Sequence, residues 1–330
     1  MSGQILRRTG GRRIAGAIIF ALLVLIAILA PVIAPYDINE QDAVRYVRDA
    51  SGELLPIPPP HSLSWDHLLG TDRWGYDVLT RMLYGARYTL GFIVGVAVVR
   101  VALGFLIASF AHLWTHARRR WQPRKVQSHA IGTAVPEFVV AYIALAGIAF
   151  GPPMSAFPFA VIQGVLISIV GLPGLIPTLR ARMERAVAEP FVEAQVAAGA
   201  DEWHIYTHTV VPAMAQDLWL LVSHEALLVA LVTGELALFH IFVGGTVRTF
   251  DPVEYYSRSH EWVGMVGENS GEILGGIYRL ILIPLAGYLV VVVALALLSE
   301  GRRPQLVRHR LSPATRRVST FCSEGEANAE

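Results

Sequence analysis

Long apolar runs alternate with short polar segments along the chain. Six runs reach the roughly 20 residues that a helix needs to cross about 30 Å of hydrocarbon. They cover residues 14–34, 88–113, 130–150, 159–179, 218–242 and 277–298. Because helical hydrogen bonding satisfies the backbone in lipid, the pattern predicts an all-α, polytopic membrane protein with six transmembrane helices.

Two of these runs carry a local complication. The first follows four arginines, as a signal peptide does, but its apolar run is longer than a signal peptide needs, so we expect an uncleaved anchor. The fourth contains "GLPGLIP", residues 171–177, whose glycines and prolines predict a kinked or broken helix end.

Composition agrees with a membrane protein. Of the 330 residues, 54% are hydrophobic and only 16% are charged. The net charge of +1 argues against a nucleic-acid interface, which needs a clustered basic excess. The single cysteine, Cys322, excludes a disulfide within the chain.

The distribution of basic residues predicts the orientation. With the N-terminus inside, the inner segments hold 18 Lys and Arg residues and the outer segments hold 7. Positively charged flanks tend to stay in the cytoplasm, so both termini are expected there.

Four segments follow from this topology. Residues 1–35 form an inner tail and the first helix, and residues 36–87 form an outer loop leading into the second helix. The outer loop, with its "PIPPPH", is either a docking site or a solvated linker. Residues 88–300 form the membrane core, and residues 301–330 are expected to be a disordered basic tail.

The polar stretch 189–214 is predicted to lie on the inner side, as a pair of short helices. Gly199 suits the end of the first helix, and Asp201 suits the cap of the second, with Glu202 in its first turn. Trp203, Tyr206 and Val210 share one face, and Pro212 is expected to end the element. Such a pair either docks into a soluble partner, lies on lipid, or is a packed connector.

This stretch resembles the EAA signature of permeases from binding-protein-dependent ABC importers, E-A-A-x3-G-x9-I-x-L-P. Glu193, Ala194, Gly199 and Pro212 stand at the motif's spacing. Three positions depart from it: Gln195 replaces the second Ala, Thr209 the Ile and Val211 the Leu.

A second stretch, "LLGTDRWGYDVLTRMLYGARYTLG" at 68–91, resembles the run that opens the C-type permeases of the dipeptide, oligopeptide and nickel group. The matching residues are Gly70, Thr71, Asp72, Gly75, Asp77, Arg81, Tyr84, Gly85 and Arg87. Tyr76 stands where the family usually has Arg.

The resemblance implies a type I ABC importer permease in a bacterial inner membrane. Its implied partners are a second homologous permease, two cytoplasmic ATPase subunits that bind ATP-Mg, and an extracytoplasmic substrate-binding protein. The second helix of the signature would be the coupling helix, with Glu193, Ala194, Gly199, Asp201, Glu202, Trp203, Tyr206 and Pro212 in the coupling loop. The implied cargo is a di- or oligopeptide, with nickel or another small solute as the alternative.

Other chemistries find little support. Lys125 is the only lysine and does not stand in a Walker A loop, so this chain is not expected to bind ATP that way. "HEALL" at 224–228 lacks the second His of a zinc-protease motif. His204 and His208 are spaced to share a metal but lack an evident third ligand. We therefore expect no catalytic residue, no bound cofactor and no metal site.

Ionisable residues within the apolar runs are costly and should be paired or hydrated. Arg100 and Glu225 are predicted to pair in the bundle interior, while Glu137 and Glu235 are expected nearer the interfaces. Arg100, Glu225 and Glu235 either line a polar translocation pathway or fix helix packing. The rival function is a self-sufficient, proton-coupled secondary transporter that uses such carboxylates.

Overall fold

The computed structural model describes residues 2–42, 44–48, 53–117, 135–215 and 218–300. Five of its helices are long and apolar enough to cross a membrane: α1 (Ser2–Ile33), α2 (Val78–Ala117), α4 (Ala156–Val187), α8 (Leu218–Leu238) and α10 (Arg279–Ser299). The third predicted span, residues 130–150, contains α3 (Glu137–Ala146), a helix of ten residues. Residues 118–134 and the tail 301–330 lie outside the described residues, so neither the full extent of that span nor the expected disorder of the tail is tested.

Helix α2 begins ten residues before the predicted span because the chain supplies a cap. The Asp77 carboxylate accepts the Thr80 backbone N–H at 2.7 Å, a bond that stabilises the first turn. Gly70 and Gly75, with φ of +75° and +86°, make the turns that lead into this cap.

The fourth span was predicted to be kinked or broken at residues 171–177, and the break is wrong. Helix α4 continues through Pro173 and Pro177 to Val187. Each proline removes one backbone donor, but neighbouring helices and local adjustment satisfy the freed groups in membrane helices. Continuity matters because α4 thereby extends from the core to the polar stretch at 189–214.

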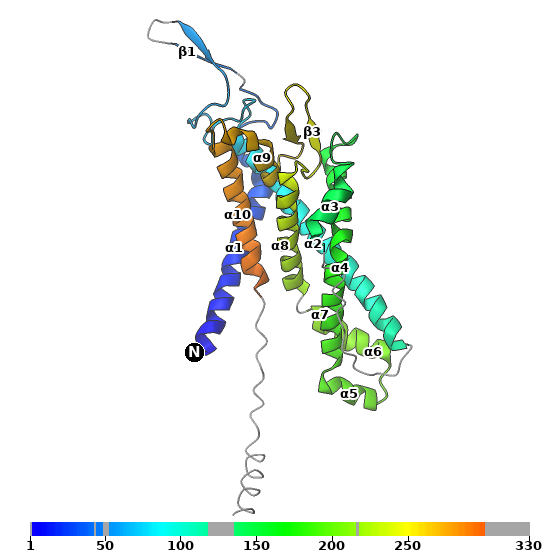
Figure 1. Ribbon diagram of the computed structural model, residues 1–330. Coiled ribbons are helices and arrows are strands. Elements are labelled where there is room, and N and C mark those ends of the chain that lie inside the picture. Colours follow the sequence, from blue (N-terminus) through cyan, green and yellow to red (C-terminus); the bar gives the residue numbers. More distant parts are fainter. Residues whose placement is uncertain (1, 43, 49–52, 118–134, 216–217, 301–330) are drawn as a thin grey trace, which may run out of the picture. The chain divides into compact units, whose positions relative to one another are not determined.

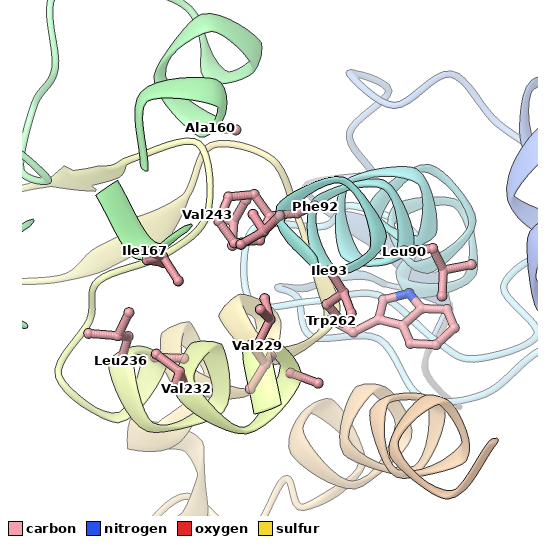
Figure 2. Packing of buried hydrophobic residues seen from close by; sticks show 14 of the residues in the cluster. Leu90, Phe92, Ile93, Ala160, Ile167, Val229, Val232, Leu236, Val243 and Trp262 are labelled. Atoms are coloured by element: carbon pink, nitrogen blue, oxygen red, sulfur yellow. The ribbon is translucent and has the colours of Figure 1, made fainter. Parts of the chain in front are cut away.

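The helices pack around α2, which contacts α1, α4 and α8, while α10 lies against α1 and α8 (Figure 1). The main core comes from several of these elements. Figure 2 shows side chains from α2, α4 and α8 meeting Val243 and Trp262. Trp262 begins the short helix α9 (Trp262–Glu268), and its indole N–H donates to the Met82 carbonyl at 2.8 Å. The core therefore joins the spans to the loops at one of their ends.

Two small hairpins lie at that end. One pairs β1 (Arg45–Arg48) with β2 (Leu54–Ile57), and the other pairs β3 (Thr246–Arg248) with β4 (Tyr255–Ser257). The 3₁₀ turn η3 (Ser270–Ile273) follows α9. Short helices α5 (Pro190–Ala197), α6 (Glu202–Ile205) and α7 (Val211–Ala215) lie at the opposite end of the spans (Figure 1). The polar stretch and the loop before α2 therefore lie on opposite sides, as the sequence predicts.

Candidate functional site

The first half of the candidate coupling loop is a sharply ended helix. Gly199 has φ +86°, and its N–H donates to the Val196 carbonyl while the Ala200 N–H donates to the Gln195 carbonyl, both at 3.0 Å. This pair of bonds is the Schellman motif, which needs a left-handed residue that glycine supplies at least cost. A Cβ on Gly199 would meet nothing within 4 Å. The glycine is therefore required for backbone conformation and not for close contact within the described chain.

The second half is one helical rod, from Glu202 to Ala215, with a π-helical turn in its middle. Asp201 occupies the cap position in extended conformation, but its side chain makes no capping bond. The π turn η2 (Tyr206–Val210) carries a bond from the Val211 N–H to the Tyr206 carbonyl, five residues back. Pro212 lies inside α7 and does not end the element, which corrects the prediction. The wider turn lets the helix pass a residue that lacks an N–H.

The helical rod packs on the ends of two spans, α2 and α4, that lie opposite the hairpins (Figure 1). Tyr206 and Val210 are buried in a second apolar cluster with Val101 of α2 and Leu179 and Met183 of α4. Trp203, predicted to share their face, is 61% exposed and tilts against Tyr206 with the ring centroids 6.0 Å apart. Force applied at the exposed surface would therefore reach α2 and α4 through Tyr206 and Val210.

Two departures from the family signature compensate each other. The Thr209 hydroxyl donates to the Gln195 side-chain oxygen at 3.2 Å, which ties the second helix to the first. Both residues were noted from the sequence only as mismatches. Their joint occurrence, a polar pair replacing an apolar one, was the signal for this contact.

The other side chains of the loop face outward. Glu193, Ala194 and Asp201 are exposed, and Glu202 is half-buried. The His204 and His208 rings stack with centroids 4.2 Å apart. Within the described ranges, no group of three or more His, Cys, Asp or Glu side chains is placed to hold a metal ion.

The second candidate site is a buried charge cluster in the membrane core. The Arg100 guanidinium of α2 is fully buried and donates to Glu225 of α8 at 3.3 Å. Its other donors reach both carboxylate oxygens of Glu137 and the Ile167 carbonyl of α4. Glu137, expected nearer an interface, therefore belongs to the cluster, whereas Glu235 is exposed on α8 and acts on Glu137 only through its charge.

A tight crossing of α2 and α4 makes room for the guanidinium. Gly171 lies directly against it, since a Cβ there would stand 2.2 Å from Arg100 Cζ. Ser168, one turn earlier, donates to the Val96 carbonyl of α2 at 3.3 Å. Sequence reasoning missed Gly171, although its place in the small-residue row Gly164, Ser168 and Gly171 was a usable signal.

The same two helices border an apolar groove of about 520 Å³. Gly91 and Gly95, the small residues of "GFIVG", line it together with Phe157 and Val161 of α4. A Cβ at either glycine would meet nothing within 4 Å, so this small-residue face is not used in contacts within the described chain.

The opening signature, residues 68–91, ties the outer loop to the spans. The Asp72 carboxylate accepts the N–H groups of Trp74 and Tyr76 and lies 2.5 Å from the Arg81 guanidinium. Tyr76, which stands where the family has Arg, lies under the Arg81 guanidinium, 4.0 Å from ring centre to Cζ. The signature end of the loop at 36–87 is thus an ordered part of the fold in its described residues, while the choice between a docking site and a solvated linker stays a prediction.

Further signature residues bind α2 to its neighbours. Arg87 donates to the Ala27 carbonyl of α1 at 2.9 Å. Gly85 allows the chain at His260 to approach, because a Cβ there would stand 1.9 Å from the His260 carbonyl oxygen. The signature is therefore a set of structural ties.

Glu261 and Glu268 are two buried carboxyls in and beside the short helix α9. Burial raises the pKa of Glu261 to about 7, although the Val243 N–H donates to it at 3.4 Å. Burial likewise raises the pKa of Glu268 to about 7, with Arg81 3.8 Å away and the Ser257 N–H donating at 2.9 Å. Burial lowers the pKa of His260 to about 3.

These shifts predict that stability falls between pH 6.5 and pH 8. In this range the unfolded carboxyls are already ionised, while the folded carboxyls lose their protons in a buried site. Folded His260 is neutral throughout, but the unfolded histidine, with its ordinary pKa of 6.5, loses its proton at the lower end of the window and offsets part of the loss there. Each carboxyl contributes a loss of about 1 kcal/mol across the window. Thermal unfolding of the detergent-solubilised protein at several pH values measures how steeply stability falls with pH. Glu261→Gln should reduce the slope by about half, and an unchanged slope would contradict the assignment.

Comparisons with known proteins agree with this architecture. The family model for the N-terminal TM domain of oligopeptide transport permease C matches residues 13–56, which include most of α1 and the first hairpin. The di/tripeptide transport system permease protein DppC of Pseudomonas aeruginosa is 30% identical over 209 residues, 60% of each chain. Proteins of Brucella suis and Brucella melitensis, both named for a peptide transport system permease, are 32% identical over 196 residues, 58% of this chain and 57% of theirs.

These matches support an ABC peptide permease. The matched part spans less than two thirds of each relative's length. The chain is a multi-pass membrane protein, and its five long apolar helices, with α3 as a shorter apolar helix, agree with the all-helical prediction in the part of the chain that is described. The matches favour a permease subunit over a self-sufficient secondary transporter.

Proposed function

We propose that this chain is a transmembrane permease subunit of an ATP-driven, binding-protein-dependent importer of di- or oligopeptides. It resides in the bacterial inner membrane with both termini in the cytoplasm. A second permease and two ATPase subunits complete the membrane complex, and an extracytoplasmic binding protein delivers the peptide. ATP-Mg is bound by the ATPase subunits and not by this chain.

The observation that carries the proposal is the seating of the loop from α5 to α7. Gly199 fixes the angle between its two helices, and the Thr209–Gln195 bond holds them together. One face of the second helix is buried against α2 and α4, while Trp203 and Phe191 stay exposed, at 61% and 54%. An exposed aromatic surface on a well-seated helix is suited to a protein partner.

The path of motion follows from this seating. A movement of the second helix displaces Tyr206 and Val210, which contact the ends of α2 and α4. Those helices cross at Gly171 and Arg100, so the same movement bears on the charge cluster in the membrane core. The hairpins at the other end form the proposed face for the binding protein.

Purification of the intact complex from native membranes tests the proposal. We expect the tagged permease to bring down ATPase subunits and a second permease, and the complex to hydrolyse ATP. A chain that purifies alone and transports peptide with only a proton gradient would instead establish the secondary transporter.

A further inference from the structure

Arg100 of α2 is held firmly by two other helices, α4 and α8. Its guanidinium lies on the Cα of Gly171, donates to the Ile167 carbonyl at 2.9 Å and pairs with Glu225 at 3.3 Å. The Arg100 side chain is 0% exposed and that of Glu225 only 6%. Because these groups are buried and bonded in α4 and α8, separating them would leave uncompensated charge in a low-dielectric interior.

Glu137 is attached differently. It is the first residue of α3, follows Pro136 in extended conformation, and its side chain is 26% exposed. The N-terminus of a helix favours a negative charge, and about a quarter of this side chain stays outside the packed interior of the described chain. Glu137 is therefore the carboxylate that loses least on leaving Arg100.

The charges of the cluster also favour release of Glu137 over release of Glu225. The cluster places two carboxylates, Glu137 and Glu225, on one guanidinium, with His224 3.8 Å from Glu225 and 54% exposed. When Glu137 leaves, a neutral Arg100–Glu225 pair remains in the core, and the departing anion stays at the N-terminus of α3 with part of its surface exposed. When Glu225 leaves, a buried anion is stranded instead.

We propose that Glu137 is a releasable partner of Arg100, which Gly171 positions, and that this ion pair opens and closes as the permease changes conformation. The proposal rests on the proposed function, because it names the contact that frees α3 during alternating access. Gly171 acts through Arg100 and is a positioning residue.

We call the releasable Arg100–Glu137 ion pair the latch. Distances between spin labels test the latch without a measurement of transport. With the chain's single cysteine removed by Cys322→Ser, labels are placed at Ile143 of α3 and Leu282 of α10, which are 71% and 59% exposed. The detergent-solubilised protein is expected to show one dominant distance. Glu137→Gln, which removes the charge and keeps the shape, should raise a second distance population about tenfold.

Matched variants separate the latch from general damage. Gly171→Ala should raise the same second population, because its Cβ would displace the guanidinium, whereas Gly174→Ala, with nothing within 4 Å, should not. Glu53→Gln, an exposed position that makes no contact with Arg100 or Glu137, should also match the parent.

An unchanged distribution in Glu137→Gln, or an equal change in Gly174→Ala, would overturn the latch. ATP-driven peptide uptake plays no part in this measurement. Failure of the proposed function would appear in uptake, and failure of the latch would appear in the distances.

Discussion

Replacing Gly199 with valine is expected to lower ATP-driven peptide uptake at least about tenfold while the protein still inserts and folds. A β-branched residue at φ +86° is strained by roughly 1–3 kcal/mol, and the chain relieves that strain by opening the turn between α5 and α6. The surface that carries Trp203 then tilts away from its partner. Uptake of labelled trialanine by proteoliposomes containing the whole complex measures the effect.

The control uses the same position. Asn tolerates the left-handed region, so Gly199→Asn should retain most of the uptake. The open space around Gly199 leaves backbone conformation as the difference between the two variants. Equal uptake by the valine and parent proteins would show that the turn does not transmit motion.

Replacing Arg100 with leucine is expected to destabilise the folded permease by about 3–5 kcal/mol, the usual cost of removing one member of a buried ion pair. Glu225 would remain buried without a cation, and Glu137 would lose its tie to α2. Recovery of monodisperse protein and its unfolding temperature in detergent report the loss.

Two further variants show whether stranded charge causes the instability of Arg100→Leu. Arg185→Leu removes an exposed arginine of α4 and should have little effect on recovery. Combining Arg100→Leu with Glu137→Gln and Glu225→Gln removes the stranded charges and should restore much of the stability. If the triple variant is as unstable as Arg100→Leu, lost packing and not charge explains the defect.

The spans were predictable because hydrocarbon demands long apolar helices, and the length of an apolar run is visible in sequence. Their ends were less predictable. The capping bond of Asp77 starts α2 early, and α4 continues through Pro173 and Pro177 because its surroundings satisfy the backbone. Local residue preferences alone do not show such tertiary compensation.

The candidate site divides in the same way. The left-handed Gly199 follows from its place after a short helix, since glycine is the residue that ends helices most cheaply. The pairing of Arg100 with Glu225 was inferred from the cost of isolated charges in lipid. The participation of Glu137, and the contact between Gln195 and Thr209, depend on how separate helices pack, which one sequence does not display. The functional role of the coupling residues stays a prediction.

The central claim is that the loop around Gly199 meets an ATP-hydrolysing partner on the cytoplasmic side. The most direct measurement is cross-linking from position 203 in the native complex. A Trp203→Cys, Cys322→Ser variant is treated in native membranes with a cross-linker that reacts with thiols. The account predicts a cross-linked product between the permease and the ATPase subunit, and protection from a membrane-impermeant thiol reagent added outside intact cells. Labelling from outside, with no cross-link to an ATPase, would contradict it.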